Sequence, residues 1–180
     1  MIGLKKGTVK LIPHETEWEA EAQRTVARLQ AILGPVIRDI QHVGSTAIPA
    51  IKAKPIIDIA VAVEDFADVL AREKEMNDFG FYYRPNAGLE EQILFASGSY
   101  YEGTGDIQTH FIHIVPVGSK SWKHYIHFRD YMNSHPEAAK AYEDLKVSLE
   151  AKTQHDPGRE RYLQGKHDFI LSILQLADEN

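Results

Sequence analysis

The sequence contains no cysteine, which excludes disulfide bonds, thiolate zinc sites and a cysteine nucleophile. It also lacks a long apolar run, because Lys52, Lys54 and Asp58 interrupt the most apolar stretch, and the first residues show no signal-peptide pattern. We therefore expect a cytoplasmic protein that does not associate with a membrane. Basic residues are the minority, with 20 Lys and Arg against 26 Asp and Glu, so the formal charge of −6 provides no general attraction to nucleic acid.

The length and composition of the chain indicate one hydrophobic core. A chain of 180 residues with 43% hydrophobic composition is long enough for one well-buried core, whereas two domains of half this length would each be marginal. We predict a single domain, residues 1–180, of the α/β (α+β) class with a small mixed sheet. Strand patterns are confined to the first part, about 8–117, and the remainder, about 118–180, shows helical patterns only.

The first helix has a recognisable start and end, since Thr16 and Glu19 have capping-box spacing and Gly34 follows the last apolar position. Further helices are predicted at about 65–78, 119–134, 136–153 and 157–176, the last with Asp156 as N-cap and Pro157 in the first position. Strands are predicted at 36–43, 56–63, 92–96 and 108–115, with another extended piece from Phe81. The glycine-rich segment 97–106 is predicted to be a mobile loop that could cover a site.

The most informative residues are Gly44 and Ser45 at the end of a predicted strand, and Asp58, thirteen residues later. A Gly-Ser turn can offer bare backbone N–H groups to a phosphate. A carboxylate within the apolar run 56–63 is costly to bury unless it has a partner or a ligand. Together the two segments indicate a nucleotide site.

These residues carry a family resemblance. Val43-Gly44-Ser45, Lys54-Pro55 and Ile57-Asp58-Ile59 resemble the GrpB family, a branch of the nucleotidyltransferase superfamily whose core is related to that of DNA polymerase beta. The segment 109–115, Trp122, the segment 128–131, Tyr162 and Lys166 also match. The resemblance extends from about residue 8 to 174. It implies a nucleotidyltransferase-like core over about 8–117 completed by C-terminal helices, with phosphate bound at Gly44, Ser45 and Thr46.

The resemblance also implies divalent metal held by carboxylates two residues apart on one strand, but Ala60 occupies the second position. His110 and His113 are the candidate substitutes. Their spacing directs them to opposite faces of a strand, and we favour His113 beside Asp58. Such a pair would take a divalent cation, Mg²⁺, Mn²⁺ or Zn²⁺, and the imidazole suits transition metals better than Mg²⁺. The alternative is a structural histidine.

Several cationic residues are candidates for anion binding. Lys166 lies on the apolar stripe of the last helix, and Arg129 lies three residues after Ile126 on an apolar face. Asp58 has an alternative role as the structural partner of Lys54 or Arg129. Ser45 has an alternative role as the cap of a short segment that starts at Thr46.

Two functions remain open. The first is metal-dependent nucleotidyl transfer to an unidentified acceptor, with Asp58 and Lys54 as catalytic residues, Asp58 and His113 as metal ligands, and phosphate bound by the remaining candidates: Gly44, Ser45, Thr46, Arg129 and Lys166. The second is a non-catalytic module that binds a nucleotide or a coenzyme phosphate. For both functions we expect the partner to be a small molecule that contains phosphate. A serine hydrolase is disfavoured because the Gly-x-Ser-x-Gly elbow is absent.

Overall fold

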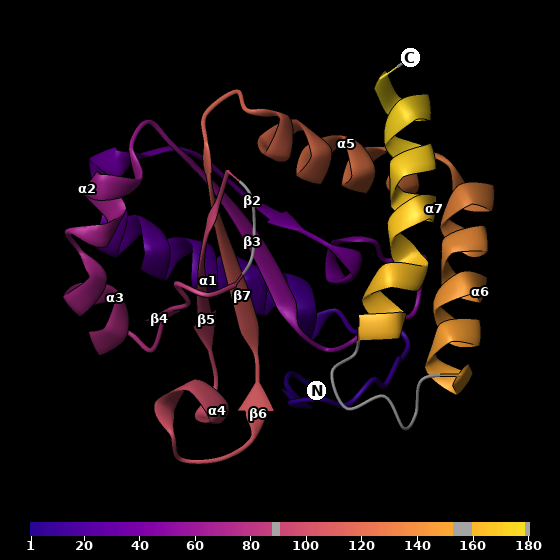
Figure 1. Ribbon diagram of the computed structural model, residues 1–180, viewed down its shortest axis with the longest axis horizontal. Coiled ribbons are helices and arrows are strands. Elements are labelled where there is room, and N and C mark those ends of the chain that lie inside the picture. The colour runs from indigo at the N-terminus through magenta and orange to yellow at the C-terminus, as the bar shows by residue number, and fades with distance from the viewer. Residues whose placement is uncertain (88–90, 153–159, 179–180) are drawn as a thin grey trace.

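The computed structural model describes residues 1–87, 91–152 and 160–178, and a five-stranded mixed sheet with the order β2-β3-β7-β5-β4 forms its centre (Figure 1). The strands are β2 (Ile37–Val43), β3 (Ile57–Val63), β4 (Tyr82–Tyr83), β5 (Ile93–Ser97) and β7 (His110–Pro116). β3 and β7 are parallel, and the other neighbouring pairs are antiparallel. A separate antiparallel pair joins β1 (Leu4–Lys5) to β6 (Ile107–Gln108). The predicted mixed α+β class is confirmed.

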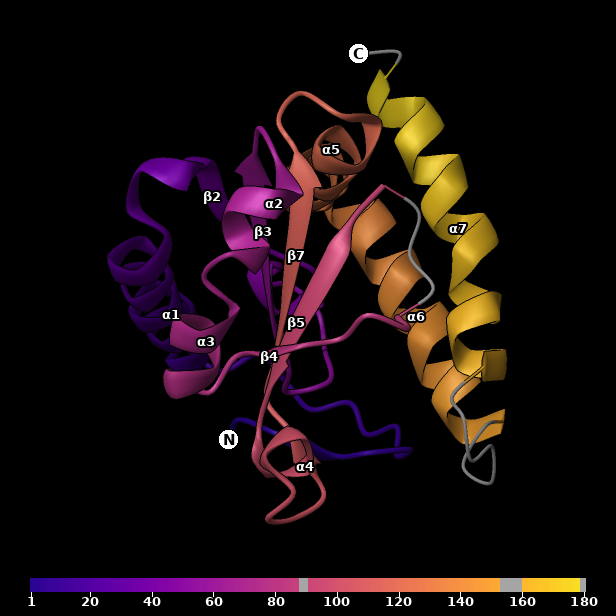
Figure 2. The same ribbon diagram turned by 60° about the vertical axis from the view of Figure 1, so that its left-hand side comes forward.

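Helices cover both faces of the sheet, as Figure 2 shows. One side carries α1 (Glu17–Leu33), α2 (Phe66–Leu70) and α3 (Glu73–Asp78), and the other carries α5 (Lys120–Ser134), α6 (Pro136–Lys152) and α7 (Glu160–Asp178). Short helices occur at Gly34–Val36, Ser45–Ala47 and Ser99–Glu102 (α4). Of the helices in the described part of the chain, none has the length and apolar character that a membrane crossing requires.

Strand β3 lies between β2 and β7 and divides the two layers of helices. Ile57, Ile59 and Val61 are fully buried in the core formed with α1, α2 and α3. Burial of each such side chain contributes about 1.5–3 kcal/mol. The alternate side chains, including Asp58, point to the opposite face. The prediction of a central strand with one anomalous carboxylate is therefore confirmed, and the anomaly faces α5, α6 and α7.

A second apolar cluster holds the three C-terminal helices against the segment that follows β2. Ile48 and Ile51 of that segment pack with Met132 of α5, Tyr142 of α6 and Ile173 of α7. The side chains of Tyr142 and Phe169 stack with ring centroids 5.3 Å apart. Because these contacts join four segments, the second cluster fixes α6 and α7 relative to the turn at Gly44.

The single helix predicted over 65–78 is wrong in one respect, because the chain forms two short helices instead. Asp65 caps the first by accepting a hydrogen bond from the backbone N–H of Ala67 at 2.8 Å. Arg72 then leaves the helical region, with φ −106° and ψ 16°. The interruption lets α2 contact β7 while α3 contacts β4, which one straight helix would not do.

Three further expectations need correction. Thr16 makes no side-chain capping bond, and Glu19 binds His42 instead of completing a capping box. Segment 97–106 contains α4 and leads into β6, and none of its residues lines the cavity described below, so it does not cover the site. The predicted strand at 108–115 is interrupted at Thr109, between β6 and β7. Asp156 and Pro157, predicted to start the last helix, lie outside the described residues.

Candidate functional site

A cavity of about 510 Å³ lies between the sheet and the C-terminal helices. Its lining comes from the turn after β2, from β3 and β7, and from α5, α6 and α7. The polar and aromatic lining residues include Gly44, Ser45, Thr46, Lys54, Asp58, His113, Tyr125, Lys146, Tyr162 and Lys166. Segments that are distant in the sequence therefore meet at the carboxylate that β3 presents.

The turn after β2 is shaped by Gly44. Its backbone has φ 72° and ψ −171°, a region that is essentially reserved for glycine. A Cβ atom added at Gly44 would lie 2.7 Å from Asp58 Oδ2. Glycine thus permits both the turn and its close approach to the carboxylate. Ser45 and Thr46 follow in a short 3₁₀ helix, and a side-chain hydrogen bond joins Ser45 to Tyr142.

Asp58 belongs to a hydrogen-bonded chain of four side chains. His113 Nε2 lies 3.1 Å from Asp58 Oδ1, and His113 Nδ1 lies 2.9 Å from the hydroxyl of Tyr125, which donates to Gln92 Oε1 at 2.9 Å. Burial and the charge of Asp58 raise the pKa of Tyr125, so its hydroxyl stays protonated.

His113 is the middle member of this chain, and both of its ring nitrogens have a partner. The donor and acceptor roles of the two nitrogens depend on the tautomer of the imidazole. The 3.1 Å between His113 Nε2 and Asp58 Oδ1 is an ordinary hydrogen-bond distance. The contact therefore holds the imidazole beside the carboxylate at the floor of the cavity.

The two histidines of β7 lie on opposite faces, as the strand spacing predicted. His113 faces the cavity, whereas His110 Nε2 lies 3.2 Å from Glu21 Oε1 of α1. Burial lowers the pKa of His110, and the charge of Glu21 opposes that shift. Among the described residues, no group of three or more His, Asp or Glu side chains is placed to hold a metal. A cation at Asp58 and His113 would therefore need further ligands from a bound molecule or water.

Lys54 and Lys166 approach the same aromatic ring. Their Nζ atoms lie 5.3 Å and 4.9 Å from the ring centroid of Tyr162, which is buried. Both lysines line the cavity. Lys54 precedes β3 and Lys166 belongs to α7, so the two positive charges converge from separate segments.

Lys146 is a third cavity lysine, and the sequence analysis did not select it. It lies on α6 with only 1% of its surface exposed. A signal was available, since Lys146 is four residues after Tyr142 and three before Leu149 on the apolar stripe of its helix. The same spacing argument had selected Lys166.

Arg129 lies outside the cavity. Its Nη1 donates to Gln41 Oε1 and to the backbone carbonyl of His42, each at 3.0 Å, and its Nε donates to Asp130 at 2.8 Å. It borders a separate groove of about 340 Å³ together with Glu19. The structure pairs Asp58 with His113 rather than with Arg129, which instead fastens α5 to β2.

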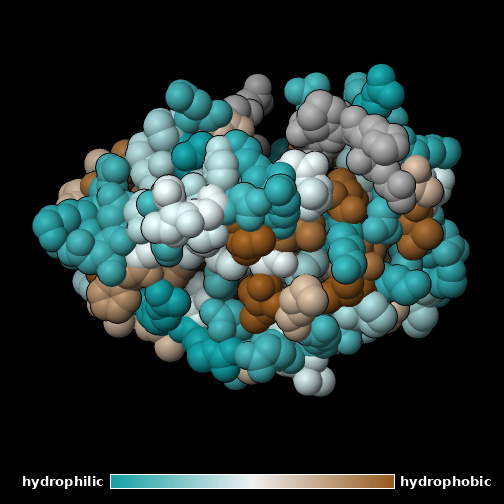
Figure 3. Space-filling view, turned by 90° about the horizontal axis from the view of Figure 1, so that it is seen from below, coloured by the Kyte–Doolittle hydropathy of each residue, from teal (hydrophilic) through white to brown (hydrophobic). Residues whose placement is uncertain are grey.

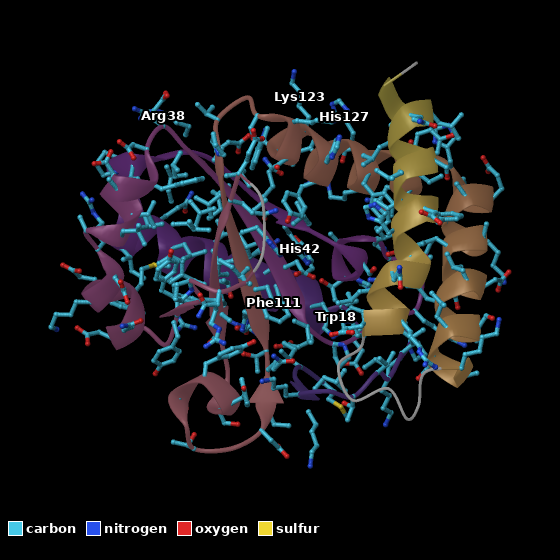
Figure 4. All side chains as sticks on the ribbon, viewed as in Figure 1. Trp18, Arg38, His42, Phe111, Lys123 and His127 are labelled. Atoms are coloured by element: carbon cyan, nitrogen blue, oxygen red, sulfur yellow. The ribbon has the colours of Figure 1, made fainter. Side chains whose placement is uncertain are left out.

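A chain of hydrogen bonds connects Glu19 of α1 to Thr46 in the turn after β2. His42 Nδ1 lies 3.2 Å from Glu19 Oε2, and His42 Nε2 lies 2.9 Å from Thr46 Oγ1. The side chain of His42 is only 10% exposed, whereas Figure 4 shows Lys123 and His127 of α5 pointing outward. Burial lowers the pKa of His42, although Glu19 opposes that shift. Glu19 thus fixes the imidazole, which fixes the Thr46 hydroxyl.

The GrpB protein family model matches residues 8–176. The chain belongs to the GrpB family. The "Glutamate-rich protein GrpB" of Alkalihalophilus pseudofirmus is 36% identical over 97% of this chain and 98% of its own length. Bacillus subtilis YqkA is 33% identical over 97% of this chain, which spans only 48% of that protein.

Three other proteins are similar to this chain in sequence or in structure. A dephospho-CoA kinase of Mycolicibacterium paratuberculosis is 28% identical over 85% of this chain, which spans 42% of that enzyme. The crystal structure of GrpB from Enterococcus faecalis has a TM-score of 0.83 and 26% identity, and the match covers 93% of this chain and 96% of that one. The Cid1 poly(U) polymerase has a TM-score of 0.51 and 16% identity, over 78% of this chain and 44% of its own. The fold is therefore that of the nucleotidyltransferases.

Proposed function

We propose that the cavity binds a nucleotide or a coenzyme-like small molecule through its phosphate groups. One observation carries the proposal: Lys54, Lys146 and Lys166 meet the Gly44–Thr46 turn in one cavity, whose described lining contains a single carboxylate, Asp58. With three amines and one carboxylate, the cavity favours the binding of an anionic ligand. The turn adds backbone N–H groups that can donate to a phosphate.

The rest of the cavity suits the part of the ligand that carries no phosphate. Tyr125 and Phe128 of α5 supply aromatic surface, and Leu163 and Leu171 of α7 line the cavity while 52% and 44% exposed. Figure 3 shows a mostly hydrophilic face on which hydrophobic residues gather toward the centre and the side of α6 and α7. A cavity of about 510 Å³ lies within the usual range for small-molecule sites, roughly 300–1,000 Å³.

The relatives guide the choice of ligands. The mycobacterial enzymes that match this chain are named for a kinase of dephospho-CoA, and Cid1 is named for a polymerase of uridine nucleotides. A test panel therefore contains the four ribonucleoside triphosphates, dephospho-CoA and CoA. Each shares the feature that the cavity is proposed to recognise, a phosphate chain on a nucleoside.

We expect the double substitution Lys54→Met and Lys166→Met to weaken binding of the best ligand in the panel by about tenfold or more for each lysine, since a hydrogen bond to a charged group contributes about 1.5–3 kcal/mol. Isothermal titration calorimetry measures the change. Lys74→Met is the matched control, because Lys74 is 84% exposed and pairs with Asp78 on α3, far from the lining residues. Equal affinities in the double variant and the control would contradict the proposal.

A second candidate, metal-dependent nucleotidyl transfer, is favoured by the contact of the Gly44 turn with Asp58. Asp58 and His113 would hold a divalent cation, which when bound would neutralise charge on the phosphates. Lys54 would neutralise charge from the other side. Ala60 occupies the position where a second carboxylate would share the face of Asp58, so a two-metal mechanism lacks one of its ligands.

We therefore expect no pyrophosphate above background when the protein is incubated with labelled triphosphates, Mn²⁺ or Mg²⁺ and a metabolite pool. The absent second carboxylate is the reason, since without it the reacting phosphate loses a metal contact. A coupled pyrophosphate assay measures the result. Release that disappears in Asp58→Asn would establish the transferase instead, because this variant keeps the size of the side chain and removes its charge.

A further inference from the structure

Lys146 has an unusual environment for an amine. It lies in the middle of α6, is 1% exposed, and lines the cavity. Its Nζ donates to the backbone carbonyl of Lys52 and lies 4.7 Å from the ring centroid of Tyr142. Within the described residues that carbonyl is the one acceptor it contacts. An ammonium group has three donors, so the charged form would leave two of them unused in a buried place.

The charges around Lys146 are mixed. Lys166 faces it from α7, Glu143 lies on its own helix beside Lys52, and the cavity lining adds Lys54 and Asp58. Tyr162 and His167 of α7 also border the cavity. Burial, together with the positive charge of Lys166, lowers the pKa of Lys146 to about 7, while Glu143 opposes the shift. Burial and the nearby lysine act in the same direction, so the neutral amine is favoured in the empty cavity.

We propose that Lys146 is an anion-binding residue of this cavity that is a neutral amine in the free protein and takes up a proton when a phosphate group binds. The inference rests on the proposed function and adds to it a proton that Lys146 takes up. A phosphate oxygen would accept the hydrogen bonds that the buried ammonium lacks and would offset the charge of Lys166. Binding and protonation then favour each other.

The test is calorimetric titration of metal-free ATP and of CoA at pH 7, 8 and 9, in buffers that differ in ionisation enthalpy. At pH 8 an amine with a pKa of about 7 is roughly nine-tenths neutral, so we expect uptake of about 0.9 proton at Lys146. Affinity should fall about tenfold between pH 8 and pH 9, since each bound ligand then requires one proton. A flat affinity profile in the wild type would overturn the proposal without any variant.

Two variants assign the proton to a residue. Lys146→Arg keeps a positive charge at every pH, so it should bind with about 0.9 proton less uptake at pH 8. Lys166→Arg should retain the uptake, because the proton belongs to Lys146. Uptake that persists in Lys146→Arg would refute the inference while the proposed function stands. If neither ATP nor CoA binds to the wild type, the proposed function itself fails.

Discussion

Gly44→Ala is expected to lower the free energy of unfolding by about 2–3 kcal/mol, which is a fall in melting temperature of roughly 5–10 °C for a chain of this size. Two costs add. Alanine is strained at φ 72° and ψ −171°, and its Cβ would lie 2.7 Å from Asp58 Oδ2. The carboxylate must then move away from His113. We expect ligand binding to be lost as well, because the turn and Asp58 no longer fit together.

Gly103→Ala is the matched control for this prediction. Gly103 has a similar φ of 75°, but its ψ of 14° is in the left-handed helical region. Apart from its two chain neighbours, no described residue places a heavy atom within 4 Å of an added Cβ. Its loss should be limited to about 1 kcal/mol. Thermal and chemical denaturation measure both variants, and calorimetry measures ligand binding. Similar losses of stability in the two variants would show that the contact with Asp58 is unimportant.

The second large effect that we predict is on the binding of a divalent cation at Asp58 and His113. In the presence of a bound nucleotide, we expect His113→Ala and Asp58→Asn to weaken Mn²⁺ binding by at least about tenfold, because each removes one of the two proposed protein ligands. His110→Ala should leave the affinity within a factor of about two, since His110 faces Glu21 on the other side of the sheet. Electron paramagnetic resonance of free Mn²⁺ follows the titration.

The outcomes of the Mn²⁺ titration separate three readings of β7. Loss in His113→Ala alone supports a cation shared with Asp58. Equal losses of Mn²⁺ affinity in His110→Ala and His113→Ala would mean that both substitutions act by disturbing β7 rather than by removing a ligand. Unchanged binding in both would assign His113 to the hydrogen-bonded chain with Tyr125 and Gln92, as a structural residue.

The sequence was most informative where a local pattern has a local cause. The apolar run 56–63 predicted a central strand because both faces of that strand are buried, and the three-residue spacing of His110 and His113 predicted opposite faces because strand side chains alternate. The family resemblance predicted the superfamily fold. Asp58 was selected because a carboxylate in such a run needs a partner.

The misses have long-range causes. Glu19 fits a capping box by spacing, but the fold brings His42 of β2 to it and the carboxylate binds there instead. The division of 65–78 into two helices depends on the positions of β7 and β4 beneath them. Arg129 has the residue type and helical position of a phosphate ligand, yet α5 directs it to Gln41. Which side of a helix faces a cavity depends on packing partners that no local pattern contains.

Lys146 is the reverse case, a cavity residue that the sequence analysis did not select. Its spacing from Tyr142 placed it on a buried stripe, but a lysine in a helix is usually read as solvated. Only the packing of α6 against α7 and the segment at Lys52 buries the amine beside the cavity. Its proposed role therefore could not be reached from the sequence.

The most direct test of the central claim is a crystal structure of the protein with the tightest-binding nucleotide or coenzyme of the panel. We expect phosphate oxygens within hydrogen-bonding distance of Ser45 and Thr46, with the amines of Lys54 and Lys166 directed at the same phosphate chain. Phosphates bound in the groove beside Arg129 and Glu19, with the cavity at Asp58 free of ligand, would contradict it.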